Sequence, residues 1–524
     1  MMEMETKSTT EELLELAEQA REEGDIEKAI GFYSQAAEAG ETDGMCQIGM
    51  LYQYGEGVEQ SYDKAIEWYQ KILEAGDTDG WFLLGTVYED LEDYDKAVEC
   101  YENQIEGGGS CQYFAFWGLA KAYQYGLGKE EDFPLALDYY HRAAGHGVVQ
   151  AMVALGEMYF NGQGVAEDYD IANYWFEKAL AADAEQPEAL GHLGMAYYYG
   201  WGKAADLDKA REYLEKAVEA GEENVMFVLG RVYYDQEDYE NAWRYFQKAA
   251  VDGNEAQEEA EDRLGDMYRF GEGVKKDLVK AVEWYKKGAE HGSEWAMCSL
   301  GYMLEHGEGV EVNEKLAAHW TLEAAKRGNT VAMFNMGADY EQAAGVEQDY
   351  VAAMAWYIRA AEAGDEDAMY KIGDLYYFGN GVEKDYSLAK EWYEKAIMAG
   401  NETPLMPLGT IYYYRQDYEK AMEFYLKAAV DGNRHQHIAE ARIGDLYMEG
   451  TGVEQDLSKT VEWYKKSAGH GYAFAMKVLG DLYAEGNGVK KDIVKAKEWY
   501  EKALEAGVDE EEAMKIKMKV DSFD

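Results

Sequence analysis

The chain of 524 residues has little of what a disulfide-bonded or membrane-spanning protein needs. Its four cysteines, Cys46, Cys100, Cys111 and Cys298, recur at no common position, and it contains only four prolines. No apolar run approaches the roughly 20 residues that a membrane-spanning helix requires. The first twenty residues contain no basic region followed by an apolar stretch, so they do not predict a secretory signal. These absences predict a protein that does not contact the membrane.

Basic residues are also scarce. The chain carries 49 Lys and Arg against 104 Asp and Glu, which gives a formal net charge of −55 at pH 7. Such a surface repels nucleic acid and anionic membranes and attracts basic partners. We therefore expect a basic protein ligand and no direct binding of nucleic acid. A long exposed surface is also often acidic for solubility alone, and composition leaves that alternative open.

One unit is repeated along nearly the whole chain, and residues 365–400 show it most regularly. Ile372, Gly373 and Tyr376 share one face of a predicted helix, and a glycine loop at residues 379–382 leads to a second helix that ends before another glycine. Glycine inside a helix costs about 1 kcal/mol relative to alanine. Its repetition at this position therefore predicts that the second helix approaches the first closely.

Positions equivalent to Gly373 recur every 35 to 38 residues. They are Gly49, Gly85, Ala120, Gly156, Gly194, Gly230, Gly265, Gly301, Gly337, Gly373, Gly409, Gly444 and Gly480. A further second-helix pattern at residues 29–33 marks a fourteenth unit. Two short helices bury too little surface to be stable alone, whereas stacked copies form a continuous core. The pattern predicts an all-α fold, an α-solenoid of about fourteen helix–turn–helix repeats.

The consensus of the repeat is clearest in two units. They contain Leu155-Gly156, Tyr159, the loop 162–165, Asp168 and Trp175-Phe176, and the same pattern at residues 479–500. This signature resembles that of Sel1-like repeats, relatives of the tetratricopeptide repeat. The resemblance implies a right-handed α-solenoid that serves as an adaptor or regulatory scaffold and usually binds protein ligands on its concave face. Some secreted members of that family close each repeat with a disulfide. The cysteines here lack that spacing, so we expect a reducing, cytoplasmic location.

The repeat pattern predicts three segments. Residues 1–40 form a unit whose turn at residues 23–25 lacks the glycine loop, so it resembles a plain tetratricopeptide repeat and is expected to cap the amino-terminal end. Residues 41–508 form a continuous Sel1-like array. Residues 509–524 are expected to form a short amphipathic capping helix with a frayed end.

The sequence shows no constellation for catalysis or for a cofactor. The glycine loop recurs in most units with no preceding strand and no P-loop lysine, so we interpret it as a helix–helix turn and not as a nucleotide site. His435 and His437 form an H-x-H pair without a nearby third metal ligand. Tryptophans at one second-helix position, such as Trp392, are expected in the core. We therefore predict a non-catalytic protein without a cofactor or a metal.

Candidate binding residues lie on the predicted outward face of the first helices. We call the position equivalent to Gly373 in each unit the framework glycine. Five residues after it, six of the thirteen units carry an aromatic residue. One residue after it, several units carry aspartate. Exposed rings among carboxylates suit a groove for a basic, partly apolar peptide. The alternative is that the rings pack between adjacent first helices. With one first-helix tryptophan outside the framework, the candidates are Tyr54, Tyr125, Tyr199, Phe270, Trp295, Phe378, Tyr414, Asp266 and Asp374.

Two functions fit these features. The first is a non-catalytic scaffold or adaptor that binds a basic or extended protein segment on its concave face. The second is an acidic decoy that mimics nucleic acid and inhibits a DNA- or RNA-binding protein. A decoy requires carboxylates at a regular, phosphate-like spacing, whereas a groove requires anchors between them. The aromatic series favours the groove. The sequence does not indicate the partner's identity or the oligomeric state.

Overall fold

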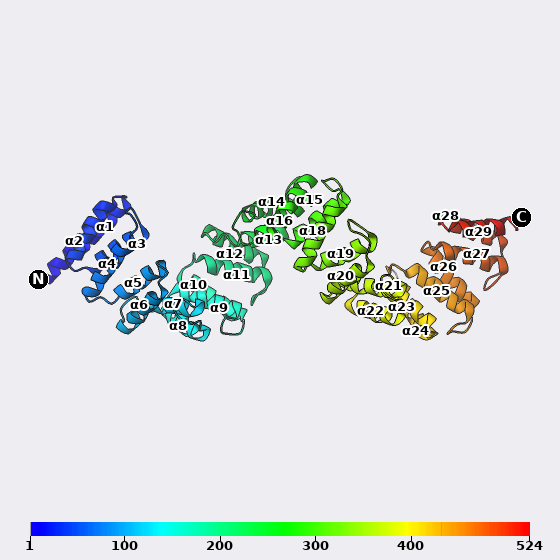
Figure 1. The fold of residues 1–524 in the computed structure, drawn as a ribbon, viewed down its shortest axis with the longest axis horizontal. Coiled ribbons are helices and arrows are strands. Elements are labelled where there is room, and N and C mark those ends of the chain that lie inside the picture. The colour runs from blue at the N-terminus through cyan, green and yellow to red at the C-terminus, as the bar shows by residue number, and fades with distance from the viewer. Residues whose placement is uncertain (1, 431, 524) are drawn as a thin grey trace. The chain divides into compact units, whose positions relative to one another are not determined.

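The computed structural model describes residues 2–430 and 432–523, with side chains from residue 10 onward. Within this part the regular structure is entirely helical and comprises 29 helices. Figure 1 colours the chain from blue at the amino terminus to red at the carboxy terminus. Helices α1 to α28 pack as fourteen consecutive pairs, and each pair also packs against the next within a unit. The predicted all-α solenoid is therefore confirmed. The chain divides into two compact units between Ala256 and Gln257.

The first unit contains fourteen helices among its described residues. They are α1 (Met2–Glu22), α2 (Ile26–Glu38), α3 (Thr42–Tyr54), α4 (Tyr62–Glu74), α5 (Gly80–Asp90), α6 (Tyr94–Gly107), α7 (Gln112–Tyr125), α8 (Phe133–Gly145), α9 (Val149–Asn161), α10 (Tyr169–Ala182), α11 (Pro187–Tyr199), α12 (Leu207–Glu219), α13 (Met226–Asp235) and α14 (Tyr239–Ala249).

The second unit contains fifteen helices among its described residues. They are α15 (Gln257–Phe270), α16 (Leu278–His291), α17 (Glu294–His306), α18 (Glu314–Arg327), α19 (Thr330–Gln342), α20 (Tyr350–Glu362), α21 (Glu366–Phe378), α22 (Tyr386–Ala399), α23 (Leu405–Tyr414), α24 (Tyr418–Ala428), α25 (Gln436–Glu449), α26 (Leu457–Gly469), α27 (Ala473–Glu485), α28 (Ile493–Glu505) and α29 (Glu510–Asp521).

The pair α21–α22 shows why the sequence folds in this way. Asp365 caps α21 by accepting a hydrogen bond from a backbone N–H of its first turn, and Asp385 caps α22 in the same manner. Gly379 ends α21 in the left-handed conformation, with φ of 78°. A Cβ on Gly381, also at positive φ, would lie 2.4 Å from the Cβ of Tyr350 in the preceding repeat. The glycine loop is thus a helix–helix turn, as predicted.

The framework glycine lies where the two helices of a repeat approach most closely. A Cβ on Gly373 would lie 2.5 Å from the ring of Tyr393, which is fully buried. Trp392, which the sequence placed in the core, is only partly buried, and the Lys395 ammonium lies 3.9 Å from the centre of its ring. The tyrosine therefore fills the core of the repeat, and the tryptophan covers the core's edge.

The last helix covers the carboxy-terminal end of the second unit. Asp509 caps α29, and Ile516 of α29 is 1% exposed. Lys477 of α27 forms an ion pair with Glu512 of α29 at 3.2 Å. The division of the chain into caps and an array at residues 40 and 508 stays a prediction.

Candidate protein-binding surface

The predicted aromatic residues stand at the carboxy-terminal ends of first helices. Their side chains are between 39% and 65% exposed, although rings of this size are usually more buried. These residues are Tyr54 on α3, Tyr125 on α7 and Tyr199 on α11 in the first unit, and Phe270 on α15, Phe378 on α21 and Tyr414 on α23 in the second. The framework core therefore does not use them.

Three of the predicted residues meet at one groove in the second unit. Phe378, Tyr414 and Asp374 line a hollow of about 310 Å³ that spans the consecutive first helices α21, α23 and α25. The ring of Phe378 is 62% exposed and that of Tyr414 is 65% exposed. We call this hollow the aromatic groove. The other side chains that line it belong to Tyr370, Tyr377, Tyr393, Met406, Pro407, Thr410, His435, Ile438 and Arg442.

The predicted aspartates also have a role inside their own repeats. The hydroxyl of Tyr393 donates a hydrogen bond to Asp374 at 2.7 Å, and that of Tyr285 donates to Asp266 at the same distance. Burial raises the pKa of the Asp374 carboxyl above its ordinary value. Asp266 also forms an ion pair with Arg263 at 3.2 Å. Both aspartates thus hold framework tyrosines, and each carboxylate has acceptor sites left for a ligand.

Arg442 is a groove residue that the sequence reasoning missed. Its guanidinium forms an ion pair with Asp445 at 3.2 Å, and the buried Tyr464 donates a hydrogen bond to the same carboxylate. Arg442 stands two positions before the framework glycine Gly444, on the face that also carries the first and fifth positions after it. A comparison of the residues two positions before the framework glycine in all repeats would have found Arg442.

Tyr125 lines a separate hollow in the first unit. The hollow measures about 240 Å³ and lies on α7 and α9, with Trp117, Lys121 and Glu157 among its lining residues. The Lys121 ammonium lies 4.7 Å from the centre of the Trp117 ring and 3.1 Å from a carboxylate oxygen of Glu89. This cation is therefore neutralised by its own neighbours.

The remaining predicted residues lie apart from these hollows. Tyr199 stacks on Trp201 with 4.4 Å between ring centres, and its hydroxyl accepts a hydrogen bond from Arg231 at 3.3 Å. The packing alternative thus describes Tyr199. Trp295 is 55% exposed, but it lies in the first turn of α17, about 16 Å along the helix from the end that carries the fifth position. Tyr54 and Phe270 line neither hollow.

The two helix layers of the second unit differ in charge. The first helix α15 carries five carboxylates and two arginines, whereas the second helix α16 carries three lysines and two glutamates. Ion pairs on the second helices are mostly exposed pairs within one helix, such as Lys427 with Glu423 at 2.7 Å. The excess of negative charge in this pair of helices therefore belongs to the layer that carries the aromatic residues.

No three side chains of His, Cys, Asp or Glu in the described part of the chain are arranged to hold a metal ion. His437, of the H-x-H pair, packs edge-on against Tyr472, and burial lowers the pKa of its imidazole. No described helix combines the length and the apolar character that crossing a membrane requires.

Comparison with known proteins shows which family the chain belongs to: it is a member of the Sel1 repeat family. The Sel1 repeat matches residues 16–41, 42–77, 115–148, 149–183, 187–222, 258–293, 296–329, 330–365, 366–401, 408–433, 437–472 and 473–508. The tetratricopeptide repeat matches residues 78–106 and 223–250. In these two segments a short turn replaces the glycine loop, and Glu92 and Glu237 adopt φ of 57° and 62° there. Sel1 and tetratricopeptide repeat proteins generally mediate protein–protein interactions and are generally non-catalytic.

Similar proteins come from bacteria and from a plant. The crystal structure of c5321, a protective antigen of uropathogenic Escherichia coli with an SLR fold, is 28% identical, with a TM-score of 0.61 over 81% of this chain and 94% of that one. A Sel1 repeat protein from Oxalobacter formigenes is 32% identical over 53% of this chain and 98% of its own, with a TM-score of 0.33. The ERAD-associated E3 ubiquitin-protein ligase component HRD3A of Arabidopsis thaliana is 38% identical over 66 residues. The match covers 13% of this chain and spans only 10% of the length of that relative.

Proposed function

We propose that the protein is a non-catalytic scaffold that binds a basic, extended segment of a partner protein along its first helices. The aromatic groove carries this proposal. Phe378 and Tyr414 present two rings that are more than 60% exposed, on consecutive repeats, beside carboxylates of the same surface. Exposed aromatic rings supply contact area at a low cost in conformational entropy.

The charge of the chain supports a basic ligand. A net charge of −55 attracts cationic segments over distances of about a Debye length and speeds their association. Within the groove, Arg442 is already paired with Asp445, so it does not present an unpaired positive charge to a cationic ligand. The rings of Phe378 and Tyr414 are not a feature that imitation of a phosphate backbone requires, which is why we favour a groove over a decoy. All four cysteines are free, which fits a reducing, cytoplasmic location.

The experiment compares the wild-type chain with a double variant, Phe378→Ala with Tyr414→Ala. Peptides of twelve residues are selected from a random display library on the wild type, and their affinities for both proteins are measured. We expect selected peptides to combine Lys or Arg with apolar residues, and to bind the double variant at least tenfold more weakly. Their affinity for the wild type should fall as salt rises from 0.1 M to 1 M.

A matched control removes exposed apolar side chains from the other layer. Leu426 on α24 and Val494 on α28 are 46% and 70% exposed, and both become alanine in the control variant. The control should bind the selected peptides as the wild type does. Equal binding of the peptides by the groove variant would overturn the assignment of the groove. Selected peptides that carry Lys and Arg without apolar residues, and that bind the groove variant as tightly as the wild type, would favour the decoy.

A further inference from the structure

The junction formed by α17, α18 and α19 departs from the framework in its second helix. Thr321 stands where a large side chain lies against the framework glycine in the other repeats. Twelve other units have a position equivalent to Gly373. In eleven of them the side chain against that position is an aromatic ring, and in the twelfth it is Leu214. The rings belong to Tyr69, Tyr101, Tyr140, Phe176, Phe246, Tyr285, Tyr357, Tyr393, Tyr425, Tyr464 and Tyr500. This junction therefore lacks the side chain that fills the others.

The same junction departs from the framework a second time, in the first helix of the next repeat. Asp339 stands two positions after the framework glycine, where each of the other twelve units has a buried apolar residue. Those residues are Leu51, Val87, Ala122, Met158, Ala196, Val232, Met267, Met303, Leu375, Ile411, Leu446 and Leu482. Thr321 thus stands in place of a large apolar side chain, and Asp339 stands in place of an apolar residue. Both positions line one hollow. We call α17–α18–α19 the hollow junction.

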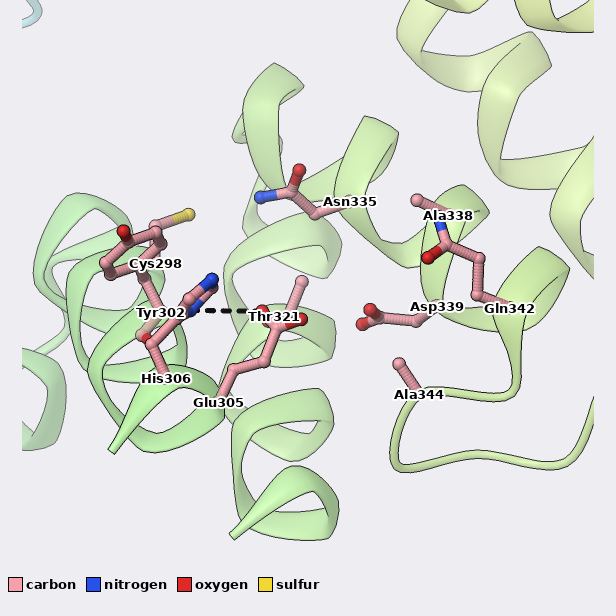
Figure 2. A pocket seen from close by; sticks show the side chains of 10 residues that line it. All are labelled: Cys298, Tyr302, Glu305, His306, Thr321, Asn335, Ala338, Asp339, Gln342 and Ala344. Atoms are coloured by element: carbon pink, nitrogen blue, oxygen red, sulfur yellow. Dashed lines mark hydrogen bonds and ion pairs between the residues drawn. The ribbon is translucent and has the colours of Figure 1, made fainter. Parts of the chain in front are cut away.

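The hollow measures about 270 Å³, and Figure 2 shows the side chains around it. Tyr302 and Glu305 of α17 lie on one side, and Asp339 of α19 points toward them from the other. The ring of Tyr302 is held in place because it stacks on His306, with 4.1 Å between ring centres. Arg269 lies 4.5 Å from the centre of the same ring. These contacts give the hollow a preorganised wall.

Two carboxylates of the hollow have acceptor sites without donors. Asp339 makes no side-chain hydrogen bond or ion pair with any residue that the structure describes. Burial, and then the charge of Glu305, raises the pKa of Asp339 to about 7. His306 lies 3.8 Å from Glu305, and the nearby Arg269 is paired with Glu308 at 3.2 Å. The charge of Asp339 is therefore not compensated within the hollow.

Glu305 occupies a position that serves the framework tyrosine in some repeats, whereas in others the tyrosine donates to the residue one position after the glycine. Four positions after the framework glycine, Gln53 accepts a hydrogen bond from Tyr69 at 2.8 Å, and Gln124 accepts one from Tyr140 at 2.6 Å. Tyrosine rings cover these two glutamines, which are 1% and 4% exposed. Glu305 has no tyrosine above it, and 48% of its side chain is exposed. Its carboxylate is thus an acceptor without the tyrosine donor that Gln53 and Gln124 have.

The chemistry of the hollow selects among side chains that could enter it. A tyrosine would bring one donor and would leave either Asp339 or Glu305 unpaired. A guanidinium brings five N–H donors in a planar fork and one positive charge, so it can serve both carboxylates and relieve their repulsion. A lysine ammonium carries the same charge on a single nitrogen and lacks the planar set of donors that could contact both carboxylates.

We propose that the hollow is a specificity pocket for an arginine side chain of the bound basic segment, with Asp339 and Glu305 as its acceptors. This inference rests on the proposed function, because it names one residue that the partner segment must present. The pocket and the aromatic groove both open on the layer of first helices in the second unit.

The test uses pentapeptides Ac-Gly-Gly-Xaa-Gly-Gly-NH₂ in which Xaa is arginine, lysine, citrulline or tyrosine. Their affinities for the 524-residue chain are measured by NMR titration at pH 8 and low salt. We expect the arginine peptide to bind at least tenfold more tightly than the lysine peptide, and the neutral citrulline and tyrosine peptides not to bind measurably. Lysine binding equal to arginine binding, or citrulline binding within twofold of it, would overturn the proposal.

Two variants address the pocket itself. Thr321→Tyr refills the hollow with the framework ring, whose hydroxyl can donate to Glu305, and Asp339→Asn removes one acceptor charge. Each should weaken binding of the arginine peptide at least tenfold while far-UV circular dichroism stays that of the wild type. Glu311→Gln is the control, because it removes one charge from an exposed loop position of the same repeat. It should change the affinity less than twofold. Unchanged arginine binding in both pocket variants would overturn the pocket.

The outcomes separate this inference from the proposed function. If selected basic peptides bind through the aromatic groove and ignore both pocket variants, the pocket is wrong and the scaffold function stands. If the arginine peptide binds and both pocket variants abolish that binding, while no basic peptide depends on the aromatic groove, the pocket stands and the groove is wrong.

Discussion

Two junctions of the second unit share one backbone plan and differ in what fills them. In the junction α21–α22–α23, Tyr393 and Ile411 are buried in one apolar cluster, and we call it the filled junction because both framework positions hold apolar side chains. Tyr393 also lines the aromatic groove, which lies at this junction. At the equivalent positions of the hollow junction stand Thr321 and Asp339, and both line its hollow of about 270 Å³. The helices α17 and α21 nevertheless have the same length of 13 residues. The hollow junction thus keeps the backbone plan of the repeat without the framework ring.

The largest effect is expected when the filled junction is opened. Tyr393→Thr removes a fully buried ring, together with its hydrogen bond to Asp374. Loss of such a ring costs about 3–5 kcal/mol of the free energy of unfolding. Urea titration followed by near-UV circular dichroism measures the change. Tyr414→Ala is the control, since its ring is 65% exposed and its loss should cost less than about 0.5 kcal/mol. A loss of less than about 1 kcal/mol for Tyr393→Thr would show that the ring does not hold the junction together.

A smaller contrast is expected at the framework glycines. A Cβ on Gly373 would lie 2.5 Å from the ring of Tyr393, so Gly373→Ala should cost about 1–3 kcal/mol. A Cβ on Gly301 would lie 2.9 Å from the Thr321 hydroxyl oxygen and 3.3 Å from the Ala317 carbonyl oxygen, which is a looser fit than at Gly373. Helix propensity offsets about 1 kcal/mol of any cost. We expect Gly301→Ala to stay within about 1 kcal/mol of the wild type in urea titrations. Equal losses at both glycines would contradict the contrast.

The charge in the hollow junction should make stability depend on pH. Burial and Glu305 raise the pKa of Asp339 in the folded chain to about 7, above its ordinary value of 3.8. The unfolded chain therefore loses this proton at a lower pH than the folded chain, and the free energy of unfolding falls between about pH 4 and pH 7. Below that window Asp339 is protonated in both states and imposes no penalty.

Asp339→Asn removes this titration. The free energy of unfolding of the variant, relative to that of the wild type, should rise by about 1–2 kcal/mol from pH 5 to pH 8. This figure is reduced for partial exposure of the Asp339 side chain. Urea titrations at the two pH values measure the gain, and Glu311→Gln provides the comparison for a general charge effect. A difference between Asp339→Asn and the wild type that is the same at both pH values would show that Asp339 does not titrate in this window.

The smallest effect concerns the turn after α19, which forms one wall of the hollow junction. Ala343 adopts φ of 62° where α21 ends at Gly379 with φ of 78°. A left-handed conformation costs a residue with a Cβ about 1–2 kcal/mol. Ala343→Gly should therefore raise the free energy of unfolding by up to about 1 kcal/mol, and Gly379→Ala should lower it by a similar amount. Thermal unfolding monitored at 222 nm compares the two. A destabilised Ala343→Gly would contradict this account.

The candidate surface was predicted only in part. Phe378, Tyr414 and Tyr125 were found because an exposed ring interrupts a helical pattern whose core positions are already occupied, and each lines a hollow. Tyr199 satisfied the same pattern and packs on Trp201 instead. A pattern within one helix does not say which neighbouring side chain lies across the loop, so it could not separate these cases.

The sequence alone predicts the all-α repeat, its period and the glycine turns. These features are set mainly by local conformation and by contacts inside one repeat, and the same residues recur in most repeats. Only the tertiary structure decided that the departures at Thr321 and Asp339 line one hollow. They lie 18 positions apart and belong to different repeats, and each alone looks like a tolerated substitution. Whether the space between two repeats is filled depends on the side chains that both repeats place there. That contact exists only when the repeats are stacked.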